Sequence, residues 1–399
     1  MSSELKEIFL ELVRLGIGHQ SVQCSRFTVL ETSGTSDQGR AQGSVDWVAL
    51  KALAEKQGLT AIVLDGVNEV RSKRSDVRSD WFPPQTMTLE WIGEVLQNYE
   101  ARYKAYEKAI GSLAGWYNQH GFKMMVLKGY ACAMNWPVPN HRPCGDIDIW
   151  LFNQQEAADK ELGSSFRIQD PSFKIDTGHH HHTVFEWEGF TVENHYDFLN
   201  VHHHKSNVEM ERILKSLGDF ENANDSLNDN RGRRIRSVEV CGERVYLPSA
   251  NLHALFLLRH SMSNFASTGF QLRQLLDWAF FVEKHGEEID WVWLEGQVEH
   301  FGMRRLYDVF NAICVGDLGF DVRLFPQVQF VPELKDRVLN DILSPEFSEK
   351  ESGGFLSRAL FKYRRWRANA WKHELCFSES LWSAFWSGVK GHLMKPGMI

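Results

Sequence analysis

Two aspartates, Asp146 and Asp148, stand one residue apart in the stretch GDIDIWL, which is otherwise typical of a buried β-strand. Side chains alternate along a strand, so both carboxylates lie on one face while Ile147, Ile149 and Leu151 lie on the other. Two like charges this close raise each other's pKa unless a cation neutralises them. Oxygen ligands suit Mg²⁺ or Mn²⁺, so the pair predicts a divalent metal site. An edge strand with two solvated acids is the alternative for an isolated pair.

Basic residues precede this strand and favour the metal interpretation. The sequence VLKG ends a short apolar run at Lys128 and Gly129, where backbone N–H groups and a lysine can hold phosphate. Arg142 lies in a Pro-rich loop that leads through Gly145 to the acids. A guanidinium can bridge two phosphate oxygens, so we expect all four residues to border a nucleotide. The alternative for Arg142 is an ion pair with a nearby acid that fixes the loop.

A second strand supplies the remaining candidate ligands. The sequence FTVENHYDF places Glu193 and His195 on one face, and the glutamate can return beside Asp146 and Asp148. Phosphoryl transfer requires positioned metal ions and a neutralised polyphosphate, with little covalent chemistry from the protein. We therefore predict that Glu193 completes the metal site and that His195 orients this acid or contacts phosphate.

These motifs together resemble the uncharacterised nucleotidyltransferase family of the DNA polymerase β-like superfamily. The segments DWVALKALAEKQGL, LPSANLHALFLLRH and LRQLLDWAFFVEKHGEEIDW share the resemblance, which covers most of residues 46–320. It implies that Asp146 and Asp148 are the metal-binding, catalytic pair and that Glu193 is the third carboxylate. It also implies an α+β fold, with a nucleotidyltransferase-type mixed β-sheet core flanked by N-terminal and C-terminal helical regions.

Two positions depart from the superfamily's usual pattern. Lys128-Gly129 replaces the glycine-serine turn, and Glu193 stands where the superfamily generally has aspartate, with Asp197 following closely. The resemblance implies transfer of a nucleoside monophosphate from an NTP to an acceptor hydroxyl with release of pyrophosphate, using Mg²⁺ or Mn²⁺. The acceptor is open between small molecules and macromolecules. A non-catalytic nucleotide-binding protein, or one half of a toxin–antitoxin-like pair, is the alternative.

Local patterns divide the chain into four predicted regions: mainly helical residues 1–104, an α/β core at 105–205, a helical domain with a small β-hairpin at 206–345, and basic aromatic helices at 346–399. Within them we expect the following features: a polar loop at 31–43, one long helix from Thr88 to Gly121, hairpin turns at Glu188-Gly189 and Cys241-Gly242, and helices in the stretches 154–163, 249–265, 270–286 and 290–302.

Several histidines also invite a metal or nucleotide interpretation. Adjacent histidines of a strand point to opposite faces, so at most alternate members of His179–His182 could share an ion. For this cluster and for His202–His204, a solvated group or polar residues near a nucleotide pocket are alternatives. His253 and His260 share a predicted helix face, which either closes over the nucleotide or makes ordinary polar packing. One helical turn separates Arg273 from Asp277, which predicts an ion pair.

Composition limits the remaining possibilities. The 399 residues are 43% hydrophobic and 24% charged, with a net charge of −8, which argues against an electrostatic nucleic-acid binder. Six cysteines without a CxxC pair fit a reducing compartment, and no signal peptide or spanning segment is evident, so we expect a cytoplasmic protein. The basic, aromatic tail after Arg358 predicts peripheral contact with a membrane or nucleic acid, or amphipathic helices packed on the helical domain.

Overall fold

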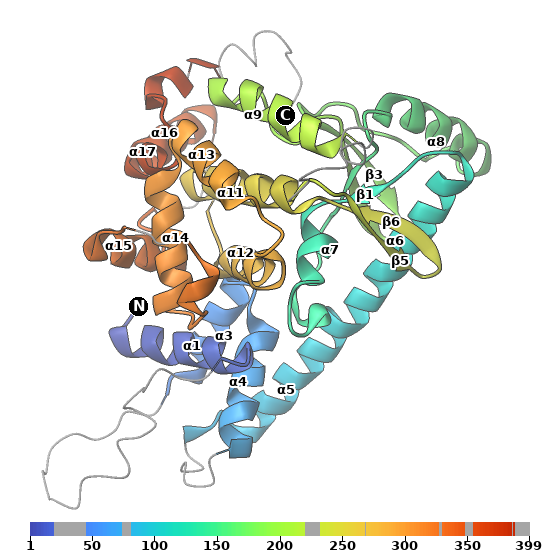
Figure 1. The fold of residues 1–399 in the computed structure, drawn as a ribbon. Helices are drawn as coiled ribbons and strands as arrows, with labels where there is room; N and C mark the ends of the chain where they lie inside the picture. The colour runs from blue at the N-terminus through green and yellow to red at the C-terminus, as the bar shows by residue number, and fades with distance from the viewer. Residues whose placement is uncertain are drawn as a thin grey trace, which may run out of the picture.

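The computed structural model describes residues 1–19, 45–73, 81–219, 232–267, 269–326, 329–347, 354–384 and 386–387. The protein has the predicted α+β architecture, with a mixed β-sheet and its covering helices on one side and the larger group of helices on the other (Figure 1). The polar loop predicted at 31–43 lies outside the described residues. No helix among the described residues combines the length and apolar character that crossing a membrane requires.

Six strands form one sheet in the order β3-β4-β2-β1-β6-β5. They are β1 (Met125–Val126), β2 (Ile147–Trp150), β3 (His182–Trp187), β4 (Phe190–His195), β5 (Arg236–Val240) and β6 (Glu243–Leu247). The pairs β2/β4 and β1/β6 are parallel, and the other neighbours are antiparallel. The predicted core at 105–205 is therefore too short for the sheet. The small hairpin expected in the helical domain extends the sheet, because β6 pairs with β1.

Both predicted hairpin turns are confirmed by their backbone angles. Glu188 and Gly189 have φ values of 46° and 81°, and Cys241 and Gly242 have φ values of 52° and 88°. Two successive residues with positive φ match the right-handed twist of the flanking strands. Glycine adopts the second of these conformations without strain, which explains why both turns contain it.

The helices before the sheet are α1 (Ser3–Gly16), α3 (Trp47–Lys56), α4 (Thr60–Lys73), α5 (Gln85–Val95) and α6 (Arg102–Gln119). A π-helical segment, η2 (Leu96–Ala101), joins α5 to α6. The expected helix from Thr88 thus begins earlier and is not uniform. Pro84 precedes its first turn, and the Thr88 hydroxyl donates to the Pro83 and Pro84 carbonyls at 3.3 and 3.1 Å instead of capping the helix.

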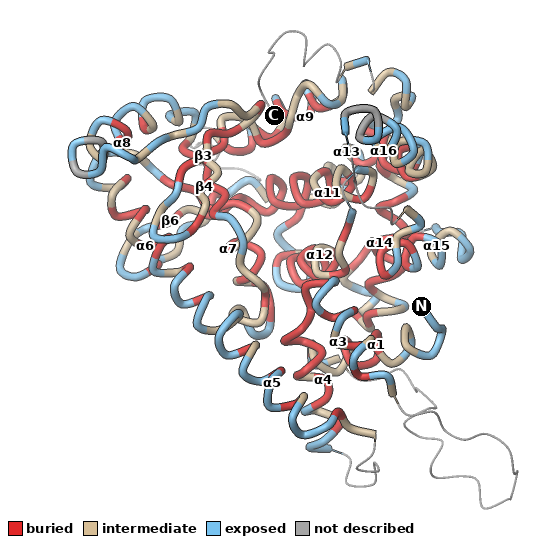
Figure 2. The backbone as a smooth tube through the Cα atoms, turned by 180° about the vertical axis from the view of Figure 1, so that it is seen from behind, coloured by how far each residue is buried: buried red, intermediate tan, exposed pale blue. Residues whose placement is uncertain are grey.

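The remaining helices are α7 (Lys128–Ala133), η3 (Pro139–His141), α8 (Gln155–Gln169), α9 (Lys205–Gly218), α11 (Ala250–Ala266), α12 (Leu272–His285), α13 (Trp291–His300), α14 (Arg304–Gly316), η4 (Val322–Leu324), α15 (Pro332–Leu343), α16 (Phe355–Ala368) and α17 (Ala370–Cys376). The most fully buried of the long helices, α11, α12 and α14, form the centre of this group (Figure 2). The helices predicted from residues 154, 249, 270 and 290 onward are therefore confirmed, with shifts of a few residues at their ends.

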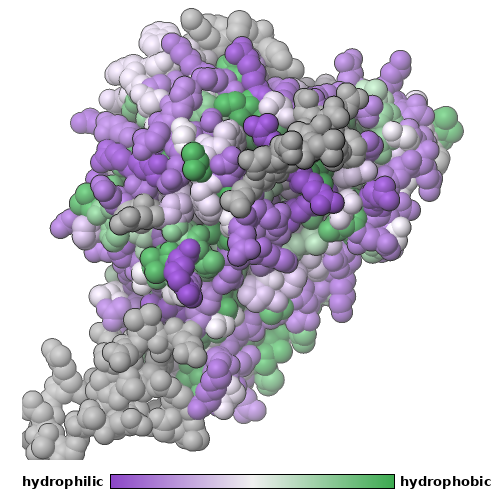
Figure 3. Space-filling model, viewed as in Figure 1, coloured by the Kyte–Doolittle hydropathy of each residue, from purple (hydrophilic) through white to green (hydrophobic). Residues whose placement is uncertain are grey.

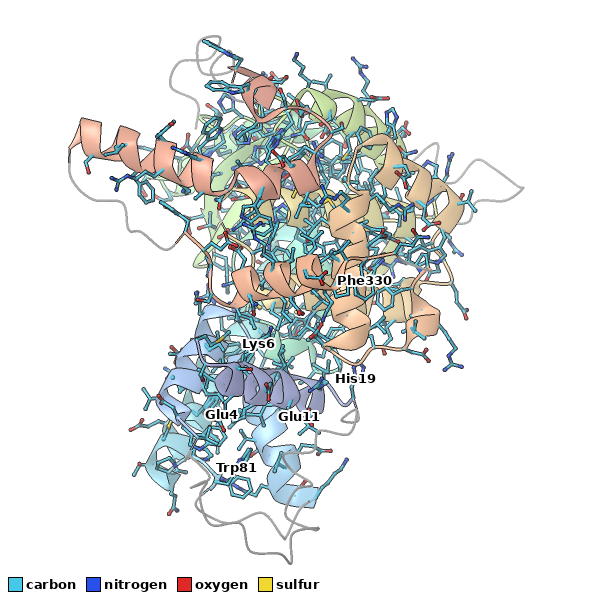
Figure 4. All side chains as sticks on the ribbon, turned by 90° about the vertical axis from the view of Figure 1, so that its left-hand side faces the viewer. Glu4, Lys6, Glu11, His19, Trp81 and Phe330 are labelled. Atoms are coloured by element: carbon cyan, nitrogen blue, oxygen red, sulfur yellow. The ribbon has the colours of Figure 1, made fainter. Side chains whose placement is uncertain are left out.

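The first helix of the chain packs on the last third of the sequence. The Lys6 ammonium donates to Asn340 Oδ1 at 2.8 Å, and His19 Nδ1 lies 3.1 Å from the Leu318 carbonyl oxygen. Figure 4 shows Lys6 on the side of α1 that meets these helices and His19 just beyond the end of α1. One hydrophobic core consequently includes α1, α3 and α4 together with α11 to α15.

A second hydrophobic core lies between the sheet and the helices α6 and α8. Ile147 and Ile149 of β2 and Val192 of β4 point into it, so the intervening residues of both strands point to the opposite face. That opposite face looks toward α11. The outer surface visible in Figure 3 is mainly hydrophilic, and its hydrophobic side chains gather in small separate groups.

Candidate functional site

The two acidic strands are parallel neighbours, and their register brings the acids together. Asp148 of β2 is paired with Glu193 of β4, and Trp150 is paired with His195. Paired residues on adjacent strands project from the same face, so the carboxylates lie side by side. The predicted division of β2 into an apolar face and an acidic face is confirmed, because Ile147 is fully buried in the opposite core.

Lys128 supplies a positive charge to this cluster. One residue separates it from β1, and it is the first residue of α7, which brings its ammonium 2.7 Å from Asp148 Oδ1. The same ammonium lies 5.9 Å from the ring centroid of Phe256, so α11 borders the site. The predicted turn at the strand end is thus the start of a short helix.

Gly129 is required by a tyrosine that the sequence alone did not single out. A Cβ atom at Gly129 would lie 2.5 Å from the Tyr106 hydroxyl oxygen. This hydroxyl, from α6, donates to the Asp146 carbonyl oxygen at 2.8 Å and so fixes the chain just before β2. Tyr106 sits in an unremarkable helical pattern, and no local signal identifies it. Gly145, the other predicted glycine, is exposed and no atom outside its chain neighbours lies within 4 Å of the Cβ position there.

His195 is fully buried between the two acids. Its Nε2 lies 3.1 Å from Asp148 Oδ1 and 3.6 Å from Glu193 Oε2, and its Nδ1 lies 3.1 Å from the Asp197 carbonyl oxygen. All of these neighbours are acceptors, which favours a ring that donates from both nitrogens. Burial lowers the pKa of His195, but its hydrogen bonds with Asp148 and Glu193 outweigh burial, and the net pKa is raised.

The three acids have different pKa shifts. Burial raises the pKa of Asp148, yet Lys128 and His195 outweigh it and hold this pKa well below its usual range. Burial likewise raises the pKa of Glu193, and the His195 hydrogen bond brings the net value below normal. Asp146 lies at the exposed end of the strand, and its pKa is raised by partial burial and then by the charges of Glu193 and Asp148. Asp148 and Glu193 are therefore ionised at neutral pH.

The ligand atoms of Asp148, Glu193 and His195 lie within 4.8 Å of one another. Two carboxylates offer the oxygen donors that Mg²⁺ and Mn²⁺ prefer, so these residues fit a hard divalent ion. Asp146 is not part of this close group, although its charge acts on both other acids. Of the predicted catalytic trio, the structure thus brings two members together and leaves the third at the exposed edge.

Arg142 lies in a different environment from the one predicted. It is buried, and its Nε and Nη2 atoms donate to Asp277 Oδ1 and Oδ2 at 2.7 and 2.8 Å. Trp136 Nε1 donates to the same carboxylate at 2.8 Å. The guanidinium fork is therefore engaged by α12 and is not directed at the acids of β2. This arrangement is the alternative considered for Arg142, an ion pair that fixes the loop.

The expected Arg273–Asp277 pair is consequently replaced by this longer-range contact. Burial lowers the pKa of Arg273 to about 10, and the nearby charge of Arg142 acts in the same direction. Among the described residues, the Arg273 side chain donates to Gln271 Oε1 at 3.2 Å. A spacing of one helical turn identifies a local partner, but it cannot reveal a better partner from a distant loop.

The two histidines of α11 have separate surroundings. His253 Nε2 lies 3.8 Å from Cys132 Sγ of α7, and its ring centroid is 4.7 Å from that of Phe281. His260 Nε2 lies 3.0 Å from Asn264 Nδ2, and its electrostatic neighbours include Lys128 and Asp148. Burial lowers the pKa of both histidines to about 3. Ordinary packing therefore accounts for His253, whereas His260 borders the acidic site.

Two members of the first histidine run approach His195. His182 is the first residue of β3 and is paired with His195, while His181 lies in the bend directly before the strand. Burial lowers the pKa of His181 to about 2 and that of His182 to about 4. The expectation that only alternate histidines can share an ion is wrong for this pair, because His181 is outside the regular strand.

In the C-terminal segment, part of the chain packs on the helical core. Lys372 and Asp341 form a buried ion pair with 2.5 Å between Nζ and Oδ2, and Leu375 to Phe377 enter the first core. The exposed side chains include Leu360, Tyr363, Trp382 and Trp386. Contact of the tail with a membrane or nucleic acid stays a prediction.

One protein family matches more than half of this chain. The family described as "Uncharacterised nucleotidyltransferase" matches residues 43–315. A crystal structure of an antigenic nucleotidyltransferase-like protein from Paracoccidioides brasiliensis is similar at 15% identity over 45% of this chain and 75% of that chain, with a TM-score of 0.29. No curated protein matches the chain. Because the family match spans more than half of the sequence and includes every strand, the chain belongs to the uncharacterised nucleotidyltransferase family.

Proposed function

We propose that this protein transfers a nucleoside monophosphate from a nucleoside triphosphate to an acceptor hydroxyl. Family membership supports a general role in nucleotidyl transfer. The observation that carries the finer proposal is the pairing of Asp148 with Glu193 on adjacent parallel strands, beside the Lys128 ammonium. This is a set of groups suited to binding a polyphosphate together with divalent cations.

Asp146, Asp148 and Glu193 are the residues that would hold Mg²⁺ or Mn²⁺. When bound, such an ion neutralises triphosphate charge and lowers the pKa of a coordinated hydroxyl. The acceptor oxygen forms a bond to the α-phosphorus, the bond to the bridging oxygen breaks, and pyrophosphate leaves with that electron pair. A carboxylate oxygen of Glu193 accepts the proton of the acceptor hydroxyl.

Lys128 has two successive partners in this proposal. Its ammonium holds Asp148 through one contact of 2.7 Å, and it exchanges that carboxylate for a triphosphate oxygen. A lysine on a flexible stem makes this exchange at less cost than a bidentate arginine does. His195 stays between Asp148 and Glu193 and keeps their side chains oriented.

The test uses the full chain with each NTP labelled at the α-phosphate, with Mg²⁺ or Mn²⁺, and with a metabolite and macromolecule extract. We expect label to enter a new product detected by mass spectrometry, and pyrophosphate to be released. The Asp146→Asn variant should give neither, while the exposed Glu156→Gln variant should behave like the unchanged protein.

A melting-temperature measurement with the same nucleotides separates the two candidate functions. Stabilisation by NTP and Mg²⁺ without a labelled product in any extract would favour the non-catalytic nucleotide-binding alternative. If no nucleotide raises the melting temperature and no product forms, both assignments are wrong.

A further inference from the structure

His181, His182 and His195 form a second group of metal-binding side chains beside the carboxylates. Each offers one ring nitrogen, and these nitrogens lie within 4.8 Å of one another. His182 is held opposite His195 by the β3/β4 pairing. His181 is fixed through its carbonyl oxygen, which accepts backbone hydrogen bonds from Tyr196 and Asp197 at 3.0 and 3.1 Å. The backbone therefore positions all three imidazoles.

The bend before β3 is what allows neighbouring histidines to converge. In a regular strand His181 and His182 would point to opposite faces. Here their ring centroids lie 4.3 Å apart, and those of His181 and His195 lie 5.4 Å apart. The centroids of His182 and His195 are separated by 5.2 Å, so each of the three rings is a neighbour of the other two.

Two atoms of this cluster are left without a partner. The Nδ1 atoms of His181 and His182 are buried and have no hydrogen-bond partner among the described residues. An unsatisfied buried polar atom costs about 1–3 kcal/mol, so such atoms usually mark a missing ligand or a functional site. Two such atoms beside a third imidazole fit a cluster that awaits a cation.

A carboxylate borders the three imidazoles. Glu193 Oε2 lies 3.9 Å from His182 Nδ1 and 3.6 Å from His195 Nε2. These separations exceed a normal hydrogen bond. Ligands at about 2.0–2.1 Å around one tetrahedral ion are about 3.3–3.4 Å from each other, so small side-chain rotations are enough to enclose one ion.

We propose that His181, His182 and His195 bind a transition-metal cation such as Zn²⁺, with Glu193 as the adjoining carboxylate. Imidazole nitrogen suits Zn²⁺, Cu²⁺ and Ni²⁺, whereas the neighbouring carboxylate group suits Mg²⁺. This inference goes beyond the proposed transfer reaction. His195 and Glu193 belong both to the histidine cluster and to the carboxylate site, so bound Zn²⁺ excludes Mg²⁺ from the carboxylate site. The resulting inhibition of transfer is the one part of this inference that rests on the proposed function.

The test is a Zn²⁺ titration of the full chain against a chromophoric chelator. We expect one tight site per chain. His181→Gln and His182→Gln should each raise the Kd for Zn²⁺ by at least about tenfold, because loss of a residue that only orients a metal-binding histidine already costs about 10–100-fold in affinity. His202→Gln is the matched control, since His202 belongs to the other histidine run and its ring faces His180 at 5.1 Å. Circular dichroism shows whether each variant is folded.

Unchanged Zn²⁺ affinity in both variants, or an equal loss in His202→Gln, would overturn the proposal. Asp146→Asn gives a separate check, because it should weaken Mg²⁺ binding more than Zn²⁺ binding. A protein that binds Zn²⁺ through these histidines but transfers no nucleotide would refute the proposed function alone. Nucleotidyl transfer without histidine-dependent Zn²⁺ binding would refute this inference alone.

Discussion

The segment between β1 and β2 has an ion pair at each end, and the two pairs are built differently. At one end the Lys128 ammonium makes a single contact of 2.7 Å with Asp148, among further carboxylates. At the other end the Arg142 fork makes two contacts of 2.7 and 2.8 Å with Asp277, which Trp136 also binds. Similar charges thus form a single-contact pair, Lys128 with Asp148, at the candidate site and a two-contact clamp, Arg142 with Asp277, behind it.

The difference follows from the neighbours of each carboxylate. The side chains that donate hydrogen bonds to Asp277, Arg142 and Trp136, are both buried. Loss of Arg142 would therefore leave the Asp277 charge unpaired in the interior. Asp148 has Glu193 and Asp146 nearby, so the cluster has an excess of negative charge that an added cation relieves. We therefore expect one pair to contribute to stability and the other to ligand binding.

The largest expected effect comes from breaking the clamp. Arg142→Ala leaves Asp277 buried and unpaired, which should lower the free energy of unfolding by about 3–5 kcal/mol. Arg142→Lys should recover only part of this, because it keeps the charge and loses the fork. Chemical denaturation measures both variants, with the exposed Arg305→Ala as control, expected within about 0.5 kcal/mol of the unchanged protein. Normal stability with weakened NTP binding in Arg142→Ala would show that Arg142 contacts phosphate after all.

The clamp should also respond to acid. Burial raises the pKa of Asp277, but the Arg142 guanidinium outweighs it, so the folded pKa lies below the usual value. Such a carboxyl stabilises the fold above its unfolded pKa of about 3.9, and this contribution is lost as the pH falls through the folded pKa. The difference in unfolding free energy between the protein and Asp277→Asn should be constant above about pH 5 and shrink below about pH 4. A difference that is independent of pH down to pH 2 would contradict the clamp.

At the site, Asp146→Asn should have the next largest effect, and on activity only. Loss of one metal ligand should reduce turnover at least about hundredfold, or about 2.7 kcal/mol in the barrier. The fold should be unaffected or slightly more stable, because the neighbouring acids already raise the pKa of Asp146. Turnover assays and melting temperatures decide this. Full activity together with a large loss of stability would mean that Asp146 is structural.

Lys128→Ala tests whether Lys128 leaves Asp148 to contact a bound nucleotide. Removing a charge-assisted phosphate contact worth about 1.5–3 kcal/mol should weaken NTP binding about tenfold to a hundredfold in the presence of Mg²⁺. Calorimetric titration measures the affinity, and the exposed Lys108→Ala of α6 is the control. If NTP affinity is unchanged while the melting temperature falls, Lys128 is a second clamp and the contrast between the pairs disappears.

Tyr106→Phe should have the smallest effect of the series. It removes the hydroxyl that donates to the Asp146 carbonyl oxygen at 2.8 Å, which should cost about 0.5–1.5 kcal/mol of stability and weaken Mg²⁺ binding slightly. Tyr117→Phe is a close control on the same helix, because the Tyr117 hydroxyl is buried and has no partner among the described residues. Equal effects of the two variants would show that Tyr106 does not position the acidic strand.

Local patterns predicted much of this fold. The alternation in β2 correctly separated the acidic face from the apolar face, and the Glu188-Gly189 and Cys241-Gly242 turns were located from glycine and hairpin spacing. These features depend on neighbours within a few residues, so period and turn chemistry are sufficient. Local patterns could not identify Asp277 as the partner of Arg142, because this partner lies on α12, far along the chain.

The sequence by itself determined which groups this protein can use: acids at alternate positions of a strand, a lysine at the end of another, and histidines beside a third. Only the tertiary structure decided their partners. Parallel pairing placed Asp148 beside Glu193, α12 engaged Arg142, and a bend turned His181 toward His195. Side-chain periodicity is a local property of the backbone, whereas strand register and helix docking are set by burial of the whole core, which no short segment specifies.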